Sequence, residues 1–565
     1  MERTLLLVTV LLPAAGALLA GGTRAWARRS ALVTTVLTLA LAGVLVGRYD
    51  PAAAGPAGAL QGYAACDVPW LGGAQGPIDV RFSLGLDGIS LWLFGLTALL
   101  MVVSVLVSWE AIQDQPAAFY RLLLVLETGM LGVFAARDII LFYVFFEFTL
   151  IPLFFLIGIW GSEERRYAAV KFLLFTLAGS VLTLLGLIAI VVWNYWHSPS
   201  GVLTFSIPRL TAGLALRPLA PGAQMSIFLA LFAGFAIKVP LFPLHTWLPL
   251  AHVQAPTAGS VILAGVLLKV GTYGFLRFNL PMLPDATAAC APWLLWLSVA
   301  GILYGALVAL AQDDIKRLIA YSSVSHLGFC MLGMFALNRL GLQGSVLQMV
   351  NHGLSTGGLF AVVGMIYERY HTRRIEDLAG LAARTPLLAF FAVLLALASI
   401  GLPGLNGFAG EFLLLAGMFQ RGWAEAAPAW AAHLRLVAVL AVAGVVLGAW
   451  YMLQLVQRVF FGPLREPAAA GDHAAHAVRD LSGREVAALS LIAVFVFWIG
   501  LQPAFFLERM QPTLEWQLSM VRGPWSVVRS PGQQTTDNGL RITDNAPRTT
   551  VDRPLTTSGV RAHVR

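Results

Sequence analysis

The sequence has few charges, few cysteines and almost no lysine. Only 12% of its 565 residues are charged, where an ordinary globular chain carries about 25%, and this excludes a soluble enzyme. Its three cysteines, Cys66, Cys290 and Cys330, are too few and too scattered for an iron–sulfur cluster or a zinc site, so we expect no metal centre on this chain. Only four of the 37 basic residues are lysine and none follows a glycine. The phosphate-binding loop of ATP-driven transporters is therefore missing.

Long apolar runs recur along the whole chain. Hydrophobic residues make up 58% of it and the mean hydropathy is +0.77, which predicts an all-α, polytopic membrane protein, because a backbone in lipid must satisfy its own hydrogen bonds. Reading runs of about 20 residues gives about 14 transmembrane helices. They lie near residues 4–20, 30–47, 86–108, 118–135, 138–158, 169–193, 225–246, 257–278, 291–311, 317–337, 344–367, 386–419, 434–456 and 487–506.

Basic residues predict the orientation of these spans. More of them lie beside loops that follow odd-numbered spans than beside the other loops, and basic loops stay in the cytoplasm. We therefore expect both termini on the periplasmic side. The net charge of +8 is interpreted as arginine in these loops rather than as a nucleic-acid surface.

Two spans are interrupted by proline and glycine, five spans apart. The interruptions fall at residues 238–243 and 401–411. Five is odd, so spans 4–8 and 9–13 would be two inverted repeats, each with a broken helix, as in many transporters. The simpler alternative is that Pro and Gly are common in membrane helices. The predicted parts are residues 1–115 (spans 1–3), 116–280 (first repeat), 290–460 (second repeat), 461–510 (a loop and span 14) and 511–565 (a polar, disordered tail).

Few ionisable groups lie inside the predicted spans. A charged group facing lipid at mid-bilayer costs at least about 2–3 kcal/mol, so these groups are expected to face the bundle interior. Both cations among them are lysine, which can release a proton when desolvated, whereas arginine stays protonated. This favours proton exchange over a purely structural ion pair. The groups are Glu127, Glu147, Lys238, Lys269, His326, His352 and Glu411.

Some of these residues have a second interpretation. Glu147 and Lys238 have opposite charges and could pair, whereas Glu127 could pair with Arg121 and ranks lower. His352 is deep enough to relay a proton, but a hydrogen-bonded packing role is as plausible. His326 follows a serine cluster that could support a water chain or simply close helix packing. His245 and His252 flank the loop after span seven and are interpreted as interfacial residues.

Several motifs together resemble the antiporter-like membrane subunits of respiratory complex I, over about residues 80–460, and the M type among them most closely. The M-type likeness rests on Leu86-Asp87-Gly88-Ile89-Ser90 and on Phe155-Leu156-Ile157-Gly158-Ile159-Trp160-Gly161. The motifs shared with the whole group are Phe145-Phe146-Glu147-Phe148-Thr149-Leu150-Ile151-Pro152, Lys238-Val239-Pro240, Pro243-Leu244-His245-Thr246-Trp247-Leu248-Pro249, Ala255-Pro256-Thr257, Leu267-Leu268-Lys269-Val270-Gly271, Tyr321-Ser322-Ser323-Val324-Ser325-His326-Leu327-Gly328 and Gly407-Phe408 with Glu411-Phe412.

This resemblance implies a proton-translocating subunit of NADH:quinone oxidoreductase in the bacterial inner membrane. It implies no cofactor on this chain, with NADH, FMN, iron–sulfur clusters and quinone on partner subunits, and L- and N-type antiporter-like subunits as neighbours. The roles that it implies are an acid and base pair at Glu147 and Lys238, a central lysine at Lys269, relay histidines at His326 and His352, and a terminal acid at Glu411.

Two alternatives stay open at this point. A subunit of a multi-subunit sodium/proton antiporter or of a membrane-bound hydrogenase shares these motifs. A passive membrane scaffold is a different class, and its buried lysines and acids would be dispensable.

Overall fold

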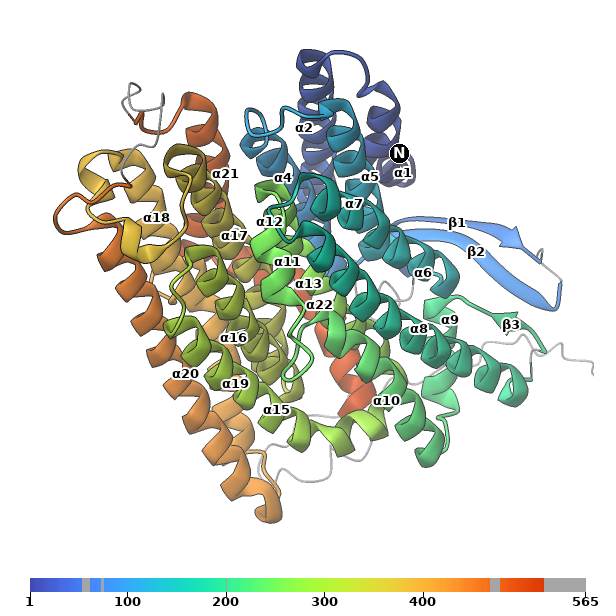
Figure 1. The fold of residues 1–565 in the computed structure, drawn as a ribbon. Helices are drawn as coiled ribbons and strands as arrows, with labels where there is room; N and C mark the ends of the chain where they lie inside the picture. The colour runs from blue at the N-terminus through green and yellow to red at the C-terminus, as the bar shows by residue number, and fades with distance from the viewer. Residues whose placement is uncertain (53–60, 73–75, 200, 468–477, 523–565) are drawn as a thin grey trace, which may run out of the picture. The chain divides into compact units, whose positions relative to one another are not determined.

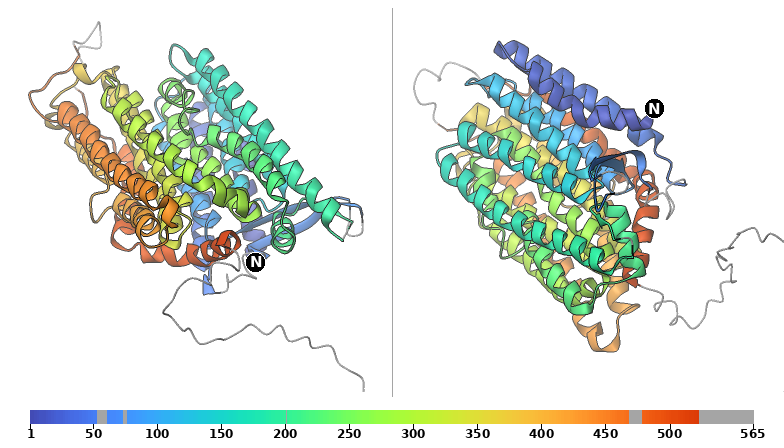
Figure 2. Two further views of the ribbon diagram at one scale, coloured as in Figure 1. Left: turned by 90° about the horizontal axis from the view of Figure 1, so that it is seen from below. Right: turned by 90° about the vertical axis from the view of Figure 1, so that its right-hand side faces the viewer.

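The computed structural model describes residues 1–52, 61–72, 76–199, 201–467 and 478–522. These residues belong to one structural unit, a bundle of helices with a short sheet at one end (Figures 1 and 2).

Thirteen helices of the described part are long and apolar enough to cross a membrane. They are α1 (Glu2–Leu19), α2 (Arg24–Arg48), α4 (Ser90–Val107), α5 (Pro116–Ala135), α6 with α7 (Ile139–Phe148 and Leu150–Trp160), α8 (Arg165–His197), α10 (Pro221–Lys238), the α12–α14 span (Thr257–Met282), α15 (Pro284–Leu310), α16 (Ile315–Phe335), α17 (Arg339–Tyr370), α20 (Pro428–Phe460) and α21 (Gly483–Leu501). The α12–α14 span consists of α12 (Thr257–Ile262), the π-helical segment η2 (Leu263–Leu267), α13 (Leu268–Gly274), a second π-helical segment η3 (Phe275–Asn279) and α14 (Leu280–Met282). The shorter elements are α9 (Ile207–Leu216), α11 (Leu248–Gln254), η4 (Ile375–Asp377), η5 (Leu381–Ala383), α18 (Pro386–Ser399), α19 (Asn406–Trp423) and α22 (Ala504–Arg522).

The remaining predicted span, the twelfth at 386–419, is one of the two interrupted spans. It consists of α18 and α19, which are joined by residues 400–405. Gly401 (φ +73°) and Gly404 (φ +90°) adopt left-handed conformations there, which glycine accepts without steric cost. The other predicted interruption follows Lys238, where α10 ends before Pro240 and α11 begins at Leu248, because proline has no N–H to continue a helix. Both breaks are present, while the inversion of the two halves stays a prediction.

The all-α prediction leaves out a β-hairpin. Strands β1 (Tyr63–Leu71) and β2 (Ile78–Leu86) pair antiparallel, and β3 (Leu203–Thr204) pairs parallel with the start of β2. The hairpin extends beside α6, and β3 lies beside α8 (Figure 1). A search for apolar runs of membrane-spanning length misses such nine-residue strands.

The start of the segment that is predicted to be a polar tail, 511–565, belongs to a helix. Helix α22 continues to Arg522, so the first part of segment 511–565 is helical, and residues 523–565 lie outside the described residues. The helix is amphipathic: its buried apolar residues recur every four positions, which is the spacing of one helical face. They are Phe506, Met510, Leu514 and Leu518. This face packs on α14, α15 and α17.

The interior of the bundle consists of few helices. In the α12–α14 span and in α17, every residue of the most apolar stretch is buried, and α16 and α4 are almost as enclosed. In α1, α2, α20 and α21, only about a third of the corresponding stretch is buried. The α12–α14 span, α16 and α17 carry Lys269, His326 and His352. These three residues therefore lie at the centre of the bundle, away from lipid.

Candidate functional site

Lys269 is fully buried on α13, between the π-helical segments η2 and η3. Wide turns of this kind are rare and frequently occur at functional sites. Its Nζ donates a hydrogen bond to the carbonyl oxygen of Ala264 in η2 and lies 2.6 Å from Nδ1 of His352. Among the residues that the structure describes, no carboxylate forms an ion pair with Lys269. Its direct partner is a base that can take its proton.

Two glycines allow the helices of Lys269 and His352 to approach each other. A Cβ on Gly353 would lie only 2.8 Å from the carbonyl oxygen of Gly265, so a larger residue would push α17 away from η2. The absence of side chains at this crossing places the imidazole of His352 against the ammonium group of Lys269.

His326, on α16, lies next to His352. Its ring centroid lies 5.6 Å from that of His352. Its Nε2 is 3.2 Å from Oγ of Ser399 and 3.5 Å from the hydroxyl of Tyr451. Its Nδ1 is 3.5 Å from Oε1 of Glu411, an ion-pair distance when the histidine is protonated.

Glu411 ends this line in the first turns of α19. Its Oε1 accepts a hydrogen bond of 3.0 Å from Nε2 of Gln348, which lies one turn before His352 on α17. Its Oε2 faces Gly401 at the break, where an added Cβ would lie 2.7 Å away. We call Lys269, His352, His326 and Glu411 the central row. Four of the six predicted site residues thus meet, from four different helical elements.

Glu147 and Lys238 are not part of this row. No ion pair between them occurs in the described part of the chain. Instead the Lys238 ammonium lies over the ring of Phe146, 3.8 Å from its centroid, and Oε1 of Glu147 is buried without a hydrogen-bond partner. Lys238 is the last residue of α10, and a helix C-terminus favours a cation. The predicted pair is therefore open in this structure, with an aromatic ring as the partner of the lysine.

Glu127 does not pair with Arg121 as the sequence suggested. It is completely buried on α5, and neither carboxylate oxygen has a hydrogen-bond partner in the described structure.

His252 and Lys316 were missed by the sequence analysis. His252, interpreted there as an interfacial residue, is completely buried, stacks on Phe360 with 4.5 Å between ring centroids, and has no hydrogen-bond partner for either ring nitrogen among the described residues. Lys316 is 6% exposed. The sequence feature that could have identified Lys316 as a candidate is that it is one of only four lysines in the chain.

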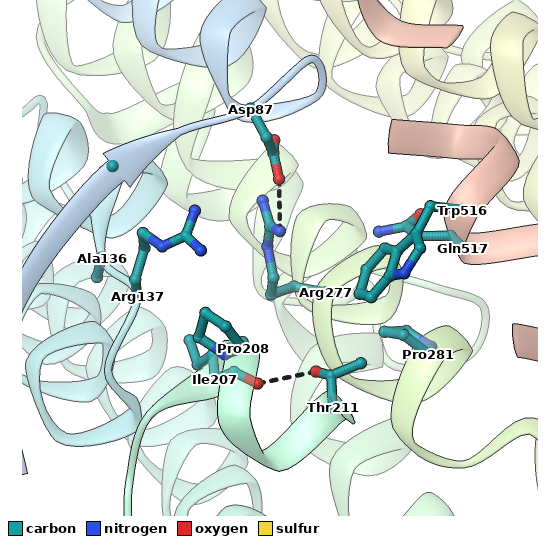
Figure 3. Close-up of a pocket in the computed structure, with 11 residues that line it drawn as sticks. Asp87, Ala136, Arg137, Ile207, Pro208, Thr211, Arg277, Pro281, Trp516 and Gln517 are labelled. Carbon is teal, nitrogen blue, oxygen red and sulfur yellow. Dashed lines mark hydrogen bonds and ion pairs between the residues drawn. The ribbon is translucent and has the colours of Figure 1, made fainter. Parts of the chain in front are cut away.

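A small pocket of about 20 Å³ lies at the end of the bundle where β2 meets α4 (Figure 3). Asp87 forms an ion pair of 2.6 Å with Arg277 there. Arg137 points into the same pocket, and Trp516 and Gln517 of α22 lie on its opposite side. Gln517 donates a hydrogen bond of 2.8 Å to the carbonyl oxygen of Leu276, so α22 is attached to the helix that carries Lys269.

The charges in this pocket are fixed. Burial alone would raise the pKa of Asp87, but Arg277 and the backbone N–H of Ser90 lower it to about 2. Burial lowers the pKa of Arg137 only to about 10. All of these groups keep their charge near neutral pH, so the pocket is a structural anchor rather than a place where protons exchange.

No group of three or more His, Cys, Asp or Glu residues in the described segments is arranged to hold a metal ion. The chemistry available to the central row is the binding and release of protons by amine, imidazole and carboxylate groups. A bundle of spanning helices around such a row defines the class of an ion-translocating membrane protein.

Comparisons with known proteins agree with this class. Residues 136–434 match the family described as "NADH:quinone oxidoreductase/Mrp antiporter, TM". NADH-quinone oxidoreductase subunit M of Rhodobacter capsulatus is 40% identical over 523 residues, which cover 91% of this chain and 96% of that protein.

Solved structures extend the comparison. A chain of respiratory complex I from Thermus thermophilus matches with a TM-score of 0.78 and 34% identity, covering 92% of this chain and 100% of that one. A chain of the Mrp complex from a Dietzia species shares the fold, with a TM-score of 0.74 at 22% identity over 92% of this chain and 52% of that one. The chain belongs to the subunit M family of NADH:quinone oxidoreductase, the antiporter-like membrane subunits of respiratory complex I.

Proposed function

We propose that the central row carries protons across the membrane while electrons are transferred elsewhere in NADH:quinone oxidoreductase. As a member of the subunit M family, the chain is a proton-translocating, multi-pass membrane subunit of bacterial respiratory complex I. NADH, FMN, iron–sulfur clusters and quinone would be bound by partner subunits, and this chain would hold no cofactor. Its neighbours would be the L- and N-type antiporter-like subunits, and both of its termini would face the periplasm.

The contact between Lys269 and His352 is the observation that carries this proposal. Two nitrogen atoms 2.6 Å apart hold one proton between them, because a second proton would place two like charges in contact inside a low-dielectric core. The proton on Lys269 can therefore move to His352 without passing through solvent. A lysine kept only for its charge would face a carboxylate instead.

The remaining steps follow the row. His352 and His326 have ring centroids 5.6 Å apart, so transfer between them requires a movement of one ring. From His326 the proton reaches the carboxylate of Glu411 over 3.5 Å. Each step breaks one N–H bond and forms one N–H or O–H bond, and every donor returns to its starting state when the next proton arrives.

Lys238 and Glu147 would control the row through their charges. Lys238 closes the C-terminal end of α10, and the residues before and after it pack on α13: a Cβ on Gly271 would lie 2.7 Å from a methyl group of Val239 and 2.9 Å from the carbonyl oxygen of Phe235. A cation that moves between the ring of Phe146 and the carboxylate of Glu147 changes the electrostatic cost of holding a proton on Lys269. Such a movement could couple a charge shift in a neighbouring subunit to proton release.

Replacement of Lys269 tests the proposal. We expect K269R, which keeps the charge but cannot release a proton, and K269M to lower pumping about 100-fold, the lower range for loss of a proton-transfer group. The measurement is proton uptake by vesicles that contain the assembled complex, together with NADH oxidation. K171M is the matched control, because Lys171 lies partly exposed against Tyr167 at the start of α8.

The alternatives give different results in the same vesicles. Pumping that survives in K269R and K269M would favour a passive scaffold and refute the proposal. Sodium uptake in place of proton uptake during NADH oxidation would indicate the ion coupling of a sodium/proton antiporter.

A further inference from the structure

A cavity of about 430 Å³ opens at the end of the bundle opposite the hairpin. It lies where α4, α7 and α17 end and α16 begins. The connections at this end follow odd-numbered spans, which are cytoplasmic in the proposed orientation. Its lining includes five acidic, basic or imidazole side chains: Glu110, Lys316, Glu368, His371 and Arg373. A cavity of this size and polarity holds water.

Lys316 lies at the inner wall of this cavity and is unusually placed for a structural cation. It is the second residue of α16, and a helix N-terminus disfavours positive charge. The nearby carboxylate of Asp314 is paired with Arg373 at 3.4 Å. The Nζ of Lys316 donates a hydrogen bond of 2.6 Å to the carbonyl oxygen of Ala255. Within the described residues, no carboxylate forms an ion pair with it.

His252 lies on α11, three residues before the Ala255 whose carbonyl oxygen binds Lys316. Its own carbonyl oxygen accepts a hydrogen bond of 3.0 Å from Oγ of Ser260 in α12, the first part of the span that carries Lys269. Its ring stacks on Phe360 of α17, the helix that carries His352. A buried imidazole whose two nitrogens lack partners loses the hydrogen bonds that it makes in water. A packing role would be filled at lower cost by an apolar residue. Its position suits a group that accepts a proton from one lysine and gives it to the other.

We infer that this cytoplasmic cavity is where protons enter the chain and that Lys316 passes each proton through His252 to Lys269. This inference rests on the proposed function. A proton from cavity water protonates the amine of Lys316, and an N–H bond breaks there as one forms on His252. Because neither ring nitrogen of His252 has a hydrogen-bond partner among the described residues, a bridging water carries the proton on each side of the ring, and the second exchange delivers it to Lys269. Lys316 and His252 then return to their neutral forms. The route reaches the central row without passing through Lys238 and Glu147.

The first test compares two replacements of Lys316. We expect K316M and K316R both to lower pumping at least about tenfold in assembled, NADH-oxidising complex, since arginine keeps the charge and the hydrogen bond to Ala255 but cannot release a proton. K171M again serves as the control. Rescue by arginine would show that Lys316 only anchors α16 and would overturn the inference, as would parent-level pumping in both variants.

The second test does not require the Lys316 variants to assemble into the complex. Ala111 lines the cavity and is exposed, so a bulky thiol reagent attached to A111C closes it. We expect labelling to lower pumping at least about tenfold and a reductant to restore it. The labelled parent chain, with its three native cysteines, and labelled A424C at the far end of α19 are the controls. Complete labelling of A111C, verified by mass spectrometry, with pumping at the parent rate would overturn the inference.

The two proposals fail separately. If K269M stops pumping while K316M, K316R and labelled A111C pump normally, only the uptake route is wrong. If K269M and K269R pump normally, the central row itself is not the path.

Discussion

Two of the buried lysines, Lys269 and Lys238, have opposite surroundings. Lys269 contacts a carbonyl oxygen and the imidazole of His352. The ring of His352 lies 5.6 Å from that of His326, which in turn lies 3.5 Å from Glu411. Lys238 lies on the face of Phe146, which holds a cation but cannot accept its proton.

In the proposed function, this difference separates the lysine that conducts protons from the lysine that controls their conduction. A proton can leave Lys269 because a base lies beside it, whereas the proton on Lys238 stays where it is until the side chain moves. In the proposed function the two lysines therefore have distinct tasks, although both lie in or beside a broken or irregular helix. Lys269 would carry protons, and Lys238 would supply a movable charge.

The largest expected effect comes from interrupting the row at His352. Glutamine at this position still accepts a hydrogen bond from Lys269 but cannot take its proton, so we expect H352Q to lower pumping about 100-fold while the complex assembles. The measurement is protons pumped per NADH oxidised, with H197Q at the exposed end of α8 as the control. Pumping at the parent ratio would show that Lys269 delivers its proton elsewhere.

A smaller effect is expected at Phe146. Loss of the ring in F146L removes a cation–π contact that contributes about 0.5–2 kcal/mol, and we expect Lys238 to move to Glu147 and pumping to fall several-fold. F146Y keeps the ring and should pump almost normally. Equal pumping in F146L and F146Y would mean that the ring only fills space. A further readout is the pH profile of pumping, which should shift in F146L alone.

The break before Glu411 should respond more weakly. Alanine at Gly401 is strained at φ +73° and places a Cβ 2.7 Å from Oε2 of Glu411, so we expect G401A to destabilise the protein by about 1–2 kcal/mol. The thermal midpoint of the purified complex measures this. G222A, in the first turn of α10 with open space around it, should leave the midpoint unchanged or raise it. A G401A complex as stable as G222A would contradict the assigned strain.

The smallest effect near neutral pH is expected for the fixed pair of Asp87 and Arg277. The pKa of Asp87 in the folded protein is about 2, below the ordinary value for an unfolded aspartate. The ion pair therefore contributes its full stabilisation of the folded state above about pH 4. We expect the stability difference between the parent and D87N to be constant from pH 8 to 5 and to fall by about 2 kcal/mol between pH 4 and 2. Burial raises the pKa of Asp138 to about 6. The pH dependence that this causes is the same in the parent and in D87N, so it cancels in the stability difference. A difference that changes between pH 8 and 5 would refute the assignment.

Much of the bundle could be predicted from the sequence, because a membrane span needs about 20 apolar residues and this length is visible in the chain. The interruptions at Pro240 and Gly401 were equally visible, since proline and glycine change the backbone itself. The hairpin and α22 were not, because their apolar residues are too few or too widely spaced to form such a run. They are stabilised by packing against the bundle.

The candidate site was predicted by residue type but not by arrangement. Buried charges are rare enough in lipid-facing sequence for Lys269 and Glu411 to be recognised. Which of them touch depends on how the helices cross, as at Gly265 and Gly353, and a single sequence does not reveal it. The burial of His252 could not be predicted for the same reason, because its ring stacks on Phe360 of a helix that is distant in the sequence.

The two wide turns around α13 have one more consequence. Each π-helical segment contains about one residue more than a regular turn would need, so the seven residues between them can exchange this surplus from one side to the other. Such a slip would rotate the intervening stretch by about 100° while α12 and α14 stay in place. The ammonium group of Lys269, the second of these seven residues, could thus exchange one set of neighbours for another while the ends of the span stay in place.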